Sequence, residues 1–519
     1  MVQCEGMEGA QKHTDHDPQS LHSLLHAQQQ TITSQHREIQ TQSERIAELE
    51  QQLEWLKRQV FGRKSERFAL PGQAELFASE ALDEVPAATE ASEQITYQRR
   101  KPKRNPLPKD LPRERIELDV ADADKVCPCC AGPRRRIGEE TTEELAFQPA
   151  KFWVREYIRP KYACPACEEG GVVSAPAPVR LIPKSLFGPE VLAQLYVSKY
   201  EDHIPLHRQL KIFRREGIEL SESTVNEAVL RGAQRLAPLV DLLKSQVLAG
   251  QRVFTDDTTL VLKGNTPGER CQARLWVYIR QGEEGPPATF FEFTTDRCRD
   301  GPLGVLGTYE GYLQADAYPG YDGLYASGRV IEIACWDHCR RYFEKAATLH
   351  KKAGRAHVAL TYIRRLYLIE REIKGQTPEA RFWARRRQSL PVLKDFKDWL
   401  DGQVGAVSTK SLFGEAVTYA LNQWQALVEY VNHGLLEISN ATAENTLRPV
   451  AVSRKNWLFA GSERGGQTAA VLFSLLATCK QNQVNPWQWL SYVLERLPTT
   501  HLAEYPSLLP FHFKDQFPL

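Results

Sequence analysis

Apolar residues at seven-residue intervals mark the first part of this 519-residue chain. The interval is kept by Leu25, Ile32, Ile39, Ile46, Leu53 and Val60, and the companion position holds Leu21, Gln28, Gln35, Gln42, Leu49 and Leu56. Such a repeat is typical of a coiled-coil seam, in which polar groups can fix register and oligomer state. We predict a coiled coil over residues 20–62 that mediates self-association. A single amphipathic helix on a globular core is the alternative.

Polar sequence with segregated charges flanks the heptads. Residues 75–94 carry six acidic and no basic residues, whereas five of the seven residues in 98–104 are basic. Sequence of this kind buries too little apolar surface to fold alone. We expect a disordered N-terminus at 1–19 and a linker at 68–112. The basic patch of the linker either contacts phosphate or is a solvated tether.

Two CxxC pairs follow the linker. Cys127 and Cys130 form the first pair, and Cys164 and Cys167 form the second after a gap of 33 residues. Four thiolates at this spacing match a tetrahedral structural zinc site. No secretory signal is visible, so we expect a cytoplasmic, reducing compartment, where thiolates bind zinc rather than form disulfides. The pattern predicts one Zn²⁺ in a small zinc ribbon over 113–180; free thiols on a small domain are the alternative.

The overall composition, 42% hydrophobic and 25% charged, fits a globular protein of several domains. The longest apolar stretch, residues 469–479, is about half of the roughly 20 residues that span a bilayer, so we expect no membrane partner. The formal net charge of +1, taken alone, argues against a nucleic-acid partner. Because the acidic segment 75–94 offsets local basic clusters, the sum leaves the partner undecided.

Helical periodicity covers residues 184–245, where Ser221 can cap a helix that follows a turn at Gly217. This arrangement fits a helix-turn-helix that contacts DNA, or an ordinary helical hairpin. From residue 250 the pattern becomes β-rich, with runs at 252–262, 273–280, 289–293, 311–315 and 330–334. Three consecutive strands followed by alternating strand and helix predict a mixed sheet covered by helices. Helical patterns return at 338–433 and 463–519.

Three acidic residues stand where these elements would present them. Asp256 lies within the first strand, Asp316 ends the fourth, and Glu444 lies early on a helix for which Asn440 is the expected cap. Carboxylates from separate elements can hold two Mg²⁺ ions about 4 Å apart, as enzymes that cleave phosphodiesters do. Since the chain has 65 acidic residues, the alternative for each one is a solvated surface charge or a helix cap.

The sequence resembles IS66-family transposases, which are of the DDE class with an RNase H-like catalytic domain. The resemblance is carried by residues 61–67, 111–115, 197–200, 203–206 and 274–278, and most specifically by 313–321 and 447–462. It implies that Asp256, Asp316 and Glu444 are catalytic and hold two Mg²⁺ ions, for which Mn²⁺ can substitute. The chain departs from the family pattern at Asp257-Thr258-Thr259, where Glu-Thr-Pro is usual, and at Asn445, where Arg is common.

The resemblance also implies a Cys-x-x-His signature, matched by Cys335 and His338. We expect His338 to be either a hydrogen-bonding group near DNA phosphates or a buried structural histidine. Candidate phosphate contacts, each of which can instead be a solvated surface residue, are Arg340, Arg341, Arg448, Arg454, Lys455 and Arg464. Trp457 either stacks on a base or belongs to the core.

The expected architecture is multidomain, α+β and α/β. It comprises the coiled coil, the zinc ribbon, a helix-turn-helix-like domain at 184–245, an RNase H-like DDE domain at 250–462 with a helical insertion at 338–433, and a helical region at 463–519. The resemblance implies a DNA transposase that cleaves and transfers strands at the ends of an insertion sequence, with target DNA and small accessory proteins as partners. An inactive end-binding regulator, a nuclease without strand transfer and a coiled-coil scaffold are alternatives.

Overall fold

The computed structural model describes residues 151–163, 172–263, 269–348 and 354–516, together with Gln35, Glu38 and Gln42, which are helical and exposed. The rest of the predicted coiled coil, the predicted linker, and Cys127, Cys130, Cys164 and Cys167 lie outside the described residues. The chain divides into two compact units, one of residues 1–62 with 159–519 and one of 63–158. Every helix and strand described below belongs to the first unit.

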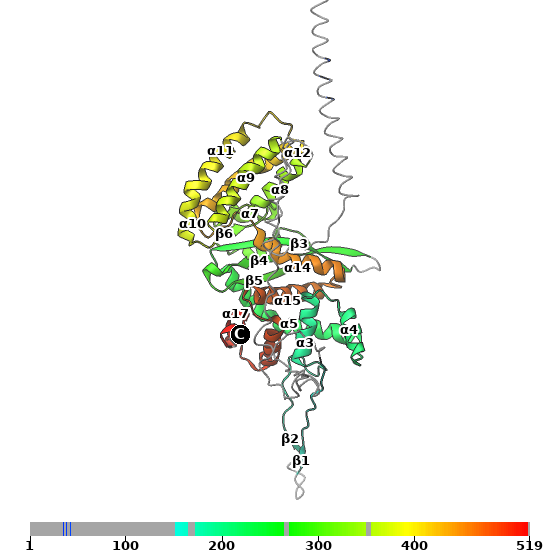
Figure 1. Ribbon diagram of the computed structural model, residues 1–519. Coiled ribbons are helices and arrows are strands. Elements are labelled where there is room, and N and C mark those ends of the chain that lie inside the picture. Colours follow the sequence, from blue (N-terminus) through cyan, green and yellow to red (C-terminus); the bar gives the residue numbers. More distant parts are fainter. Residues whose placement is uncertain are drawn as a thin grey trace, which may run out of the picture. The chain divides into compact units, whose positions relative to one another are not determined.

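A five-stranded mixed sheet organises this unit (Figure 1). Its strands, in the order β5-β4-β3-β6-β7, are β5 (Ala288–Thr294), β4 (Arg270–Arg280), β3 (Arg252–Lys263), β6 (Gly311–Gln314) and β7 (Val330–Ile333). The first three strands along the chain pair antiparallel, whereas β6 runs parallel to β3 and β7 runs parallel to β6. The predicted mixed sheet is thereby confirmed, including α7 (Asp322–Tyr325) between β6 and β7. A separate antiparallel pair joins β1 (Lys161–Ala163) and β2 (Val172–Ser174).

Two helices and a long third one match the predicted helix-turn-helix segment. They are α3 (Pro189–Tyr200), α4 (Leu206–Arg215) and α5 (Glu222–Leu248). Gly217 has φ +79°, and Ser221 Oγ accepts the Thr224 N–H at 3.2 Å, as expected for the turn and the cap. The last helix continues to Leu248, because Leu243 and Val247 extend its buried stripe, and it packs on β4 and β5.

Hydroxyl groups of α15 (Glu463–Gln481) accept hydrogen bonds from backbone N–H groups on the outer edge of β5. The Phe291 N–H donates to Ser474 Oγ at 2.7 Å, and the Thr289 N–H donates to Thr478 Oγ1 at 3.2 Å. A strand edge left unpaired is a site of unwanted association, and this helix covers it. Gly466 makes the close approach possible, because a Cβ there would lie 2.3 Å from the Phe293 ring.

Residues 338–433 are mainly helical, as predicted. The helices are α8 (Trp336–Ala347), α9 (Arg355–Glu372), α10 (Pro378–Ala384), α11 (Leu390–Asp401), α12 (Leu412–Asn422) and α13 (Trp424–Val428). All of these helices except α10 contribute to a core around Trp336, Phe343 and Phe396, which also includes Ile333 of β7. We call these helices the insertion. None of the helices in the described part of the chain is long and apolar enough to cross a membrane.

The remaining helices follow the insertion. They are α14 (Ala441–Trp457), α15, α16 (Pro486–Arg496) and α17 (Pro510–Gln516), with short 3₁₀ turns between the last two. α14, drawn in orange in Figure 1, packs on β3 and β4. α16 packs on α3, so the end of the chain covers the segment that precedes the sheet.

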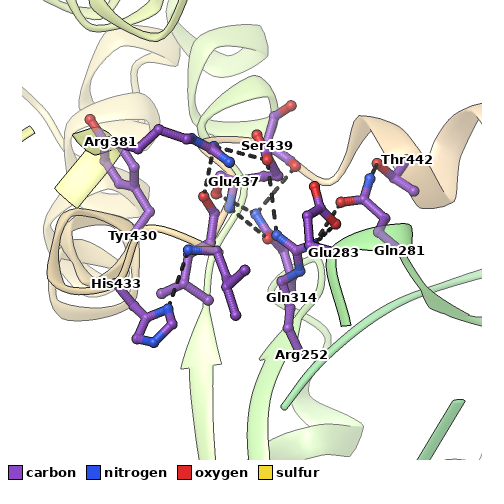
Figure 2. A network of polar contacts seen from close by, with 12 residues as sticks. Arg252, Gln281, Glu283, Gln314, Arg381, Tyr430, His433, Glu437, Ser439 and Thr442 are labelled. Atoms are coloured by element: carbon purple, nitrogen blue, oxygen red, sulfur yellow. Dashed lines mark hydrogen bonds and ion pairs between the residues drawn. The ribbon is translucent and has the colours of Figure 1, made fainter. Parts of the chain in front are cut away.

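Ion pairs and hydrogen bonds fasten the chain between the insertion and α14 (Figure 2). Glu437 Oε1 accepts from Arg381 Nη2 of α10 at 2.9 Å and lies 3.9 Å from Nη1 of the buried Arg252 of β3. Gln314 of β6 donates to the backbone oxygens of Glu437 at 2.6 Å and Ser439 at 3.2 Å. The segment 436–440 is therefore held by the insertion on one side and by the sheet on the other.

Arg385 offers a test of the insertion's polar core. Its fully buried guanidinium lies in the π-helical turn Arg385–Ser389, where it pairs with Glu370 at 2.6 Å and donates to the backbone oxygens of Tyr430 and His433. We expect Arg385→Ala to lower the free energy of unfolding by about 3–5 kcal/mol, because the Glu370 carboxylate loses its main partner. Urea unfolding measures this loss.

The matched control is Arg387→Ala, which removes an exposed arginine from the same turn. It should change the free energy of unfolding by less than about 0.5 kcal/mol. Equal effects of the two substitutions would contradict the assigned role of Arg385.

Candidate active site

The adjacent acids Asp256 and Asp257 of β3 have different surroundings, because successive side chains on a strand point to opposite faces. The Asp257 side chain is 3% exposed and is paired with Arg297 at 2.7 Å and with Arg274 at 2.9 Å. Asp256 accepts the backbone N–H of Asp257 at 2.8 Å. Asp257 is therefore neutralised by two arginines, while the Asp256 carboxylate faces the other candidate acids.

Strand pairing brings Asp316 beside Asp256. β3 and β6 are parallel, with Phe254 opposite Gln314, and each acid lies two residues further along its strand direction. Asp316 Oδ2 lies 3.9 Å from Arg297 Nη2. That guanidinium lies 4.3 Å from the centre of the Tyr318 ring, so the Arg297 side chain is held in place between the acids and the ring.

Glu444 lies in the first turn of α14, whose start is attached to two other elements. The Asn440 side-chain N–H donates to the Thr255 carbonyl of β3 at 2.8 Å, and the Asn440 backbone N–H donates to Cys335 Sγ at 3.1 Å. Asn440 occupies the cap position, as expected, but its side chain makes no capping bond. The amide is directed at the strand instead, which fixes Glu444 next to Asp256.

Burial and like charge act together on the carboxyl groups of Asp256 and Asp316. Burial, together with the negative charges of Asp316, Asp257 and Glu444, raises the pKa of Asp256 to about 7. Burial also raises the pKa of Asp316, against the lowering effect of His338 and Arg297. These effects show that the three acids converge on one site, where a cation would stabilise their ionised forms.

Two side chains of α8 hold the Glu444 carboxylate. Arg341 Nη2 donates to Oε2 at 2.5 Å, and His338 Nδ1 lies 3.7 Å from Oε1. Arg341 Nη1 also lies 3.3 Å from His338 Nε2. Of the two roles expected for His338, the placement favours a polar group at the site, since the ring faces a candidate catalytic acid.

Cys335 is the other half of the signature, and its role is structural in this geometry. The side chain is fully buried, and burial raises the pKa of its thiol to about 12. Potential ligand atoms of Cys335, His338 and Glu444 lie within 4.8 Å of one another, yet the sulfur already accepts the Asn440 N–H. Through this hydrogen bond, Cys335 joins the start of the insertion to the start of α14.

A pocket of about 230 Å³ opens over two of the three candidate acids, Asp256 and Glu444, whereas Asp316 is not among its lining residues. It is lined by Asp256, Asp257, Thr258, His338, Arg341, Glu444, Leu447, Arg448 and Ala451. Two of the six candidate phosphate contacts, Arg341 and Arg448, therefore reach the pocket. Basic and acidic side chains stand together at its rim, as binding of both a metal ion and a phosphate would require.

The other candidate phosphate contacts lie away from the pocket. Arg340 pairs with Asp337 and Glu344 of its own helix, Arg464 lies 3.6 Å from Glu227, and Lys455 is exposed. Arg454 Nη1 donates to the Thr259 carbonyl at 2.8 Å, which ties α14 to β3.

Trp457, for which base stacking and core packing were both expected, is 8% exposed. Its ring packs edge-on against Tyr200 at 6.3 Å, beneath Lys199. This placement favours the core alternative. Sequence reasoning missed Arg297, because it lies in a loop without a motif, and Arg274, although it lies in one of the segments that carry the resemblance.

In this fold, a cluster of carboxylates lies beside basic residues on a mixed sheet. Such an arrangement is typical of proteins that act on nucleic acids. The family model described as "Transposase IS66 family" matches residues 184–468. The chain belongs to this family.

Three further family models match other parts of the chain. The "zinc-finger binding domain of transposase IS66" matches residues 124–168, which include both CxxC pairs. "Transposase C of IS166 homeodomain" matches 48–116, and "IS66 C-terminal element" matches 474–511. Together with the match at 184–468, they support the predicted zinc-finger and N-terminal helical regions.

Similar proteins of comparable length occur in Sinorhizobium fredii (strain NBRC 101917 / NGR234). Uncharacterized protein y4hP is 34% identical over 90% of this chain and 89% of its own length. Uncharacterized protein y4jD is 33% identical over 92% and 96%, and Uncharacterized protein y4qI is 35% identical over 91% and 90%. The similarity therefore extends over nearly the whole chain.

The raised pKa of Asp256 predicts that the site lowers the free energy of unfolding in a pH-dependent way. Because the folded pKa of about 7 exceeds the ordinary value of 3.8, the folded state loses stability as pH rises from about 4 to 7. In buffer without added divalent metal, Asp256→Asn should raise the free energy of unfolding by a few kcal/mol at about pH 8, and much less at about pH 5.

Denaturant titrations at both pH values measure this difference. Asp395→Asn, at an exposed position of α11, is the control and should have little effect at either pH. A gain for Asp256→Asn that does not depend on pH would contradict the assigned cause.

Proposed function

We propose that this chain is a DDE-class DNA transposase that performs metal-dependent strand cleavage and strand transfer at the ends of an insertion sequence. The observation that carries the proposal is the convergence of Asp256, Asp316 and Glu444 from β3, from the end of β6 and from α14. Family membership supports the transposase role, and the basic residues Arg341 and Arg448 at the same pocket support a phosphate-containing substrate.

The catalytic fold we propose is RNase H-like. Its support is the strand order β5-β4-β3-β6-β7, with an antiparallel meander followed by two parallel strands. Asp256 and Asp316 lie on the two neighbouring central strands or directly after them, and the helix bearing Glu444 packs on the first of these strands. The insertion separates the second acid from the third along the chain.

The residues present fit hard divalent cations. Three carboxylates offer the oxygen ligands that Mg²⁺ and Mn²⁺ prefer, and Oε1 of Glu444 is buried with no hydrogen-bond partner among the described residues. Asp256, Asp316 and Glu444 would hold two Mg²⁺ ions. When bound, such ions supply an activated oxygen nucleophile and stabilise the charge that develops on the phosphate.

The chain's own residues account for binding and orientation. Arg341 and Arg448 are placed to contact phosphate oxygens next to the acids. Arg297 and Arg274 form ion pairs with Asp257 and so keep its carboxylate from competing for metal. Water would be the nucleophile at the element's end. The freed 3′-hydroxyl would be the nucleophile at the target, so one site serves both steps.

The remaining parts of the chain have supporting roles in this proposal. Cys127, Cys130, Cys164 and Cys167 would hold one structural Zn²⁺. The zinc domain and the helices α4 and α5 would bind the element's ends, and the coiled coil over 20–62 would join protomers. Small accessory proteins of the same element would complete the machinery.

Strand transfer tests the assignment of the acids. With Mg²⁺ and DNA that carries the element's ends, Asp316→Asn should reduce both cleavage and joining by about a hundredfold or more, because the site loses a metal ligand. Gel assays of cleaved and joined products measure both steps. Asp300→Asn, an exposed acid at the start of α6 (Asp300–Leu306), should leave both rates unchanged.

Joining by Asp316→Asn at the rate of the unaltered protein would refute the metal-dependent mechanism. Cleavage without joining by the unaltered protein would favour a nuclease. Binding of ends without cleavage would favour a regulator.

Zinc content tests the cysteine assignment. The purified full-length chain should contain about one zinc ion, and Cys164→Ser should lose it, because three thiolates bind zinc less tightly than four. Elemental analysis gives the stoichiometry. The control is Cys298→Ser, since Cys298 is an exposed free cysteine outside the zinc domain and its loss should not alter zinc content. Zinc retained by Cys164→Ser would refute the predicted ligand set.

A further inference from the structure

The ion pair between Arg341 and Glu444 is an unusual contact for a candidate metal ligand. Nη2 lies 2.5 Å from Oε2, and the arginine side chain is 51% exposed whereas the glutamate is 25% exposed. A guanidinium in direct contact with a ligand oxygen opposes the binding of a divalent cation there, because both carry positive charge. While this ion pair is intact, Oε2 of Glu444 is not available to bind a metal ion.

His338 orients the arginine of this ion pair. A guanidinium can only donate hydrogen bonds, so His338 Nε2 accepts in its 3.3 Å contact with Arg341 Nη1. The other ring nitrogen, Nδ1, lies 3.7 Å from Glu444 Oε1, which is beyond hydrogen-bond distance. Glu444 Oε2 is thus held by Arg341, whereas Oε1 has no hydrogen-bond partner among the described residues.

We propose that Arg341 exchanges Glu444 for a DNA phosphate, so that DNA binding completes the metal site. Arg341 lines the pocket and is half exposed, so an incoming phosphate can reach it. Phosphate accepts two parallel hydrogen bonds from a guanidinium and carries its own charge into the pocket. Once Arg341 turns to the phosphate, Glu444 is free to join Asp256 and Asp316 as a ligand.

The neighbouring arginines Arg340 and Arg297 are held mainly by acids other than the candidate metal ligands. Arg340 is held by Asp337 at 3.1 Å and by Glu344 at 3.3 Å on its own helix. Arg297 holds Asp257, whose side chain is 3% exposed and has a second arginine partner. Arg297 also lies 3.9 Å from Asp316 Oδ2, but its hydrogen bonds go to Asp257. Of these three arginines, Arg341 is the one that donates a hydrogen bond to a candidate catalytic acid.

The exchange couples two binding events thermodynamically. If DNA raises the affinity for metal, metal must raise the affinity for DNA by the same factor. The inference rests on the proposed role of Glu444 as a metal ligand. It adds that the site is incomplete without DNA, which would restrict cleavage chemistry to the DNA-bound protein.

Binding of Mn²⁺ tests the exchange without any catalytic readout. We would follow free Mn²⁺ by electron paramagnetic resonance in solutions of the full-length chain, with and without a short DNA duplex of arbitrary sequence. In the unaltered protein the duplex should tighten Mn²⁺ binding by about tenfold. In Arg341→Ala, Mn²⁺ without DNA should bind about tenfold more tightly than in the unaltered protein, and the duplex should add less than about twofold.

Arg448→Ala is the matched control. It removes the same charge from the same pocket, but Glu444 makes its ion pairs with Arg341 and His338 within the described residues. This variant should bind the duplex more weakly, gain much less Mn²⁺ affinity without DNA than Arg341→Ala, and keep the tightening by the duplex. Arg341→Gln repeats the test with a side chain of similar size and guards against misfolding of the alanine variant.

Two outcomes would overturn the inference. The first is Mn²⁺ binding without DNA that is no tighter in Arg341→Ala and Arg341→Gln than in the unaltered protein. The second is a duplex that tightens Mn²⁺ binding equally in all three proteins. Glu444→Gln and Asp256→Asn separate this failure from that of the proposed function. If these two variants lose Mn²⁺ binding while the Arg341 variants match the unaltered protein, the exchange alone is wrong. If they bind Mn²⁺ normally, the metal site itself is wrong.

Discussion

Burial of the Asp256 carboxyl group beside other acids is the constraint that the rest of the candidate site has to overcome. Burial and the neighbouring acids together raise the pKa of Asp256 to about 7, so assembly of the site costs stability in the absence of a cation. Main-chain pairing of β3 with β6 holds the first two acids together. The Asn440 bond to Thr255 adds the third. The acids are thus attached to the sheet by bonds that do not depend on metal.

The position of Glu444 also depends on the insertion. Glu437, shortly before α14, bonds to Arg381 of α10, and Asn440 bonds to Cys335 at the start of α8 (Figure 2 shows the first of these contacts). Trp336, the next residue, buries its ring in the insertion core and donates to the Leu427 carbonyl at 2.8 Å. Movement of the insertion would therefore move the third acid. A helical block placed between the second and third acids is in this way linked to the site by contact as well as by chain connectivity.

Periodicity and residue type were sufficient to predict the strands and most helices, because they report which face of an element is buried. The three acids became a site only through the resemblance, since 65 acidic residues give spacing alone little weight. Arg454 illustrates the limit: its partner, Thr259, lies 195 residues away along the chain, and nothing local distinguishes it from the pocket-lining Arg448. Partners across elements follow from the fold, which charge patterns along the chain do not encode.

A net charge of +1 says little about such a site, because the chemistry of each acid follows from the cations in contact with it. Asp257 has two arginine partners and almost no exposure, so it is a permanent structural ion pair. Asp256, its neighbour in sequence, accepts a backbone N–H and is buried beside other acids, so a cation would stabilise its ionised form. Glu444 is intermediate, with one accessible arginine that a phosphate can compete for. The acid whose partner is exchangeable is the one at which substrate binding can control metal binding.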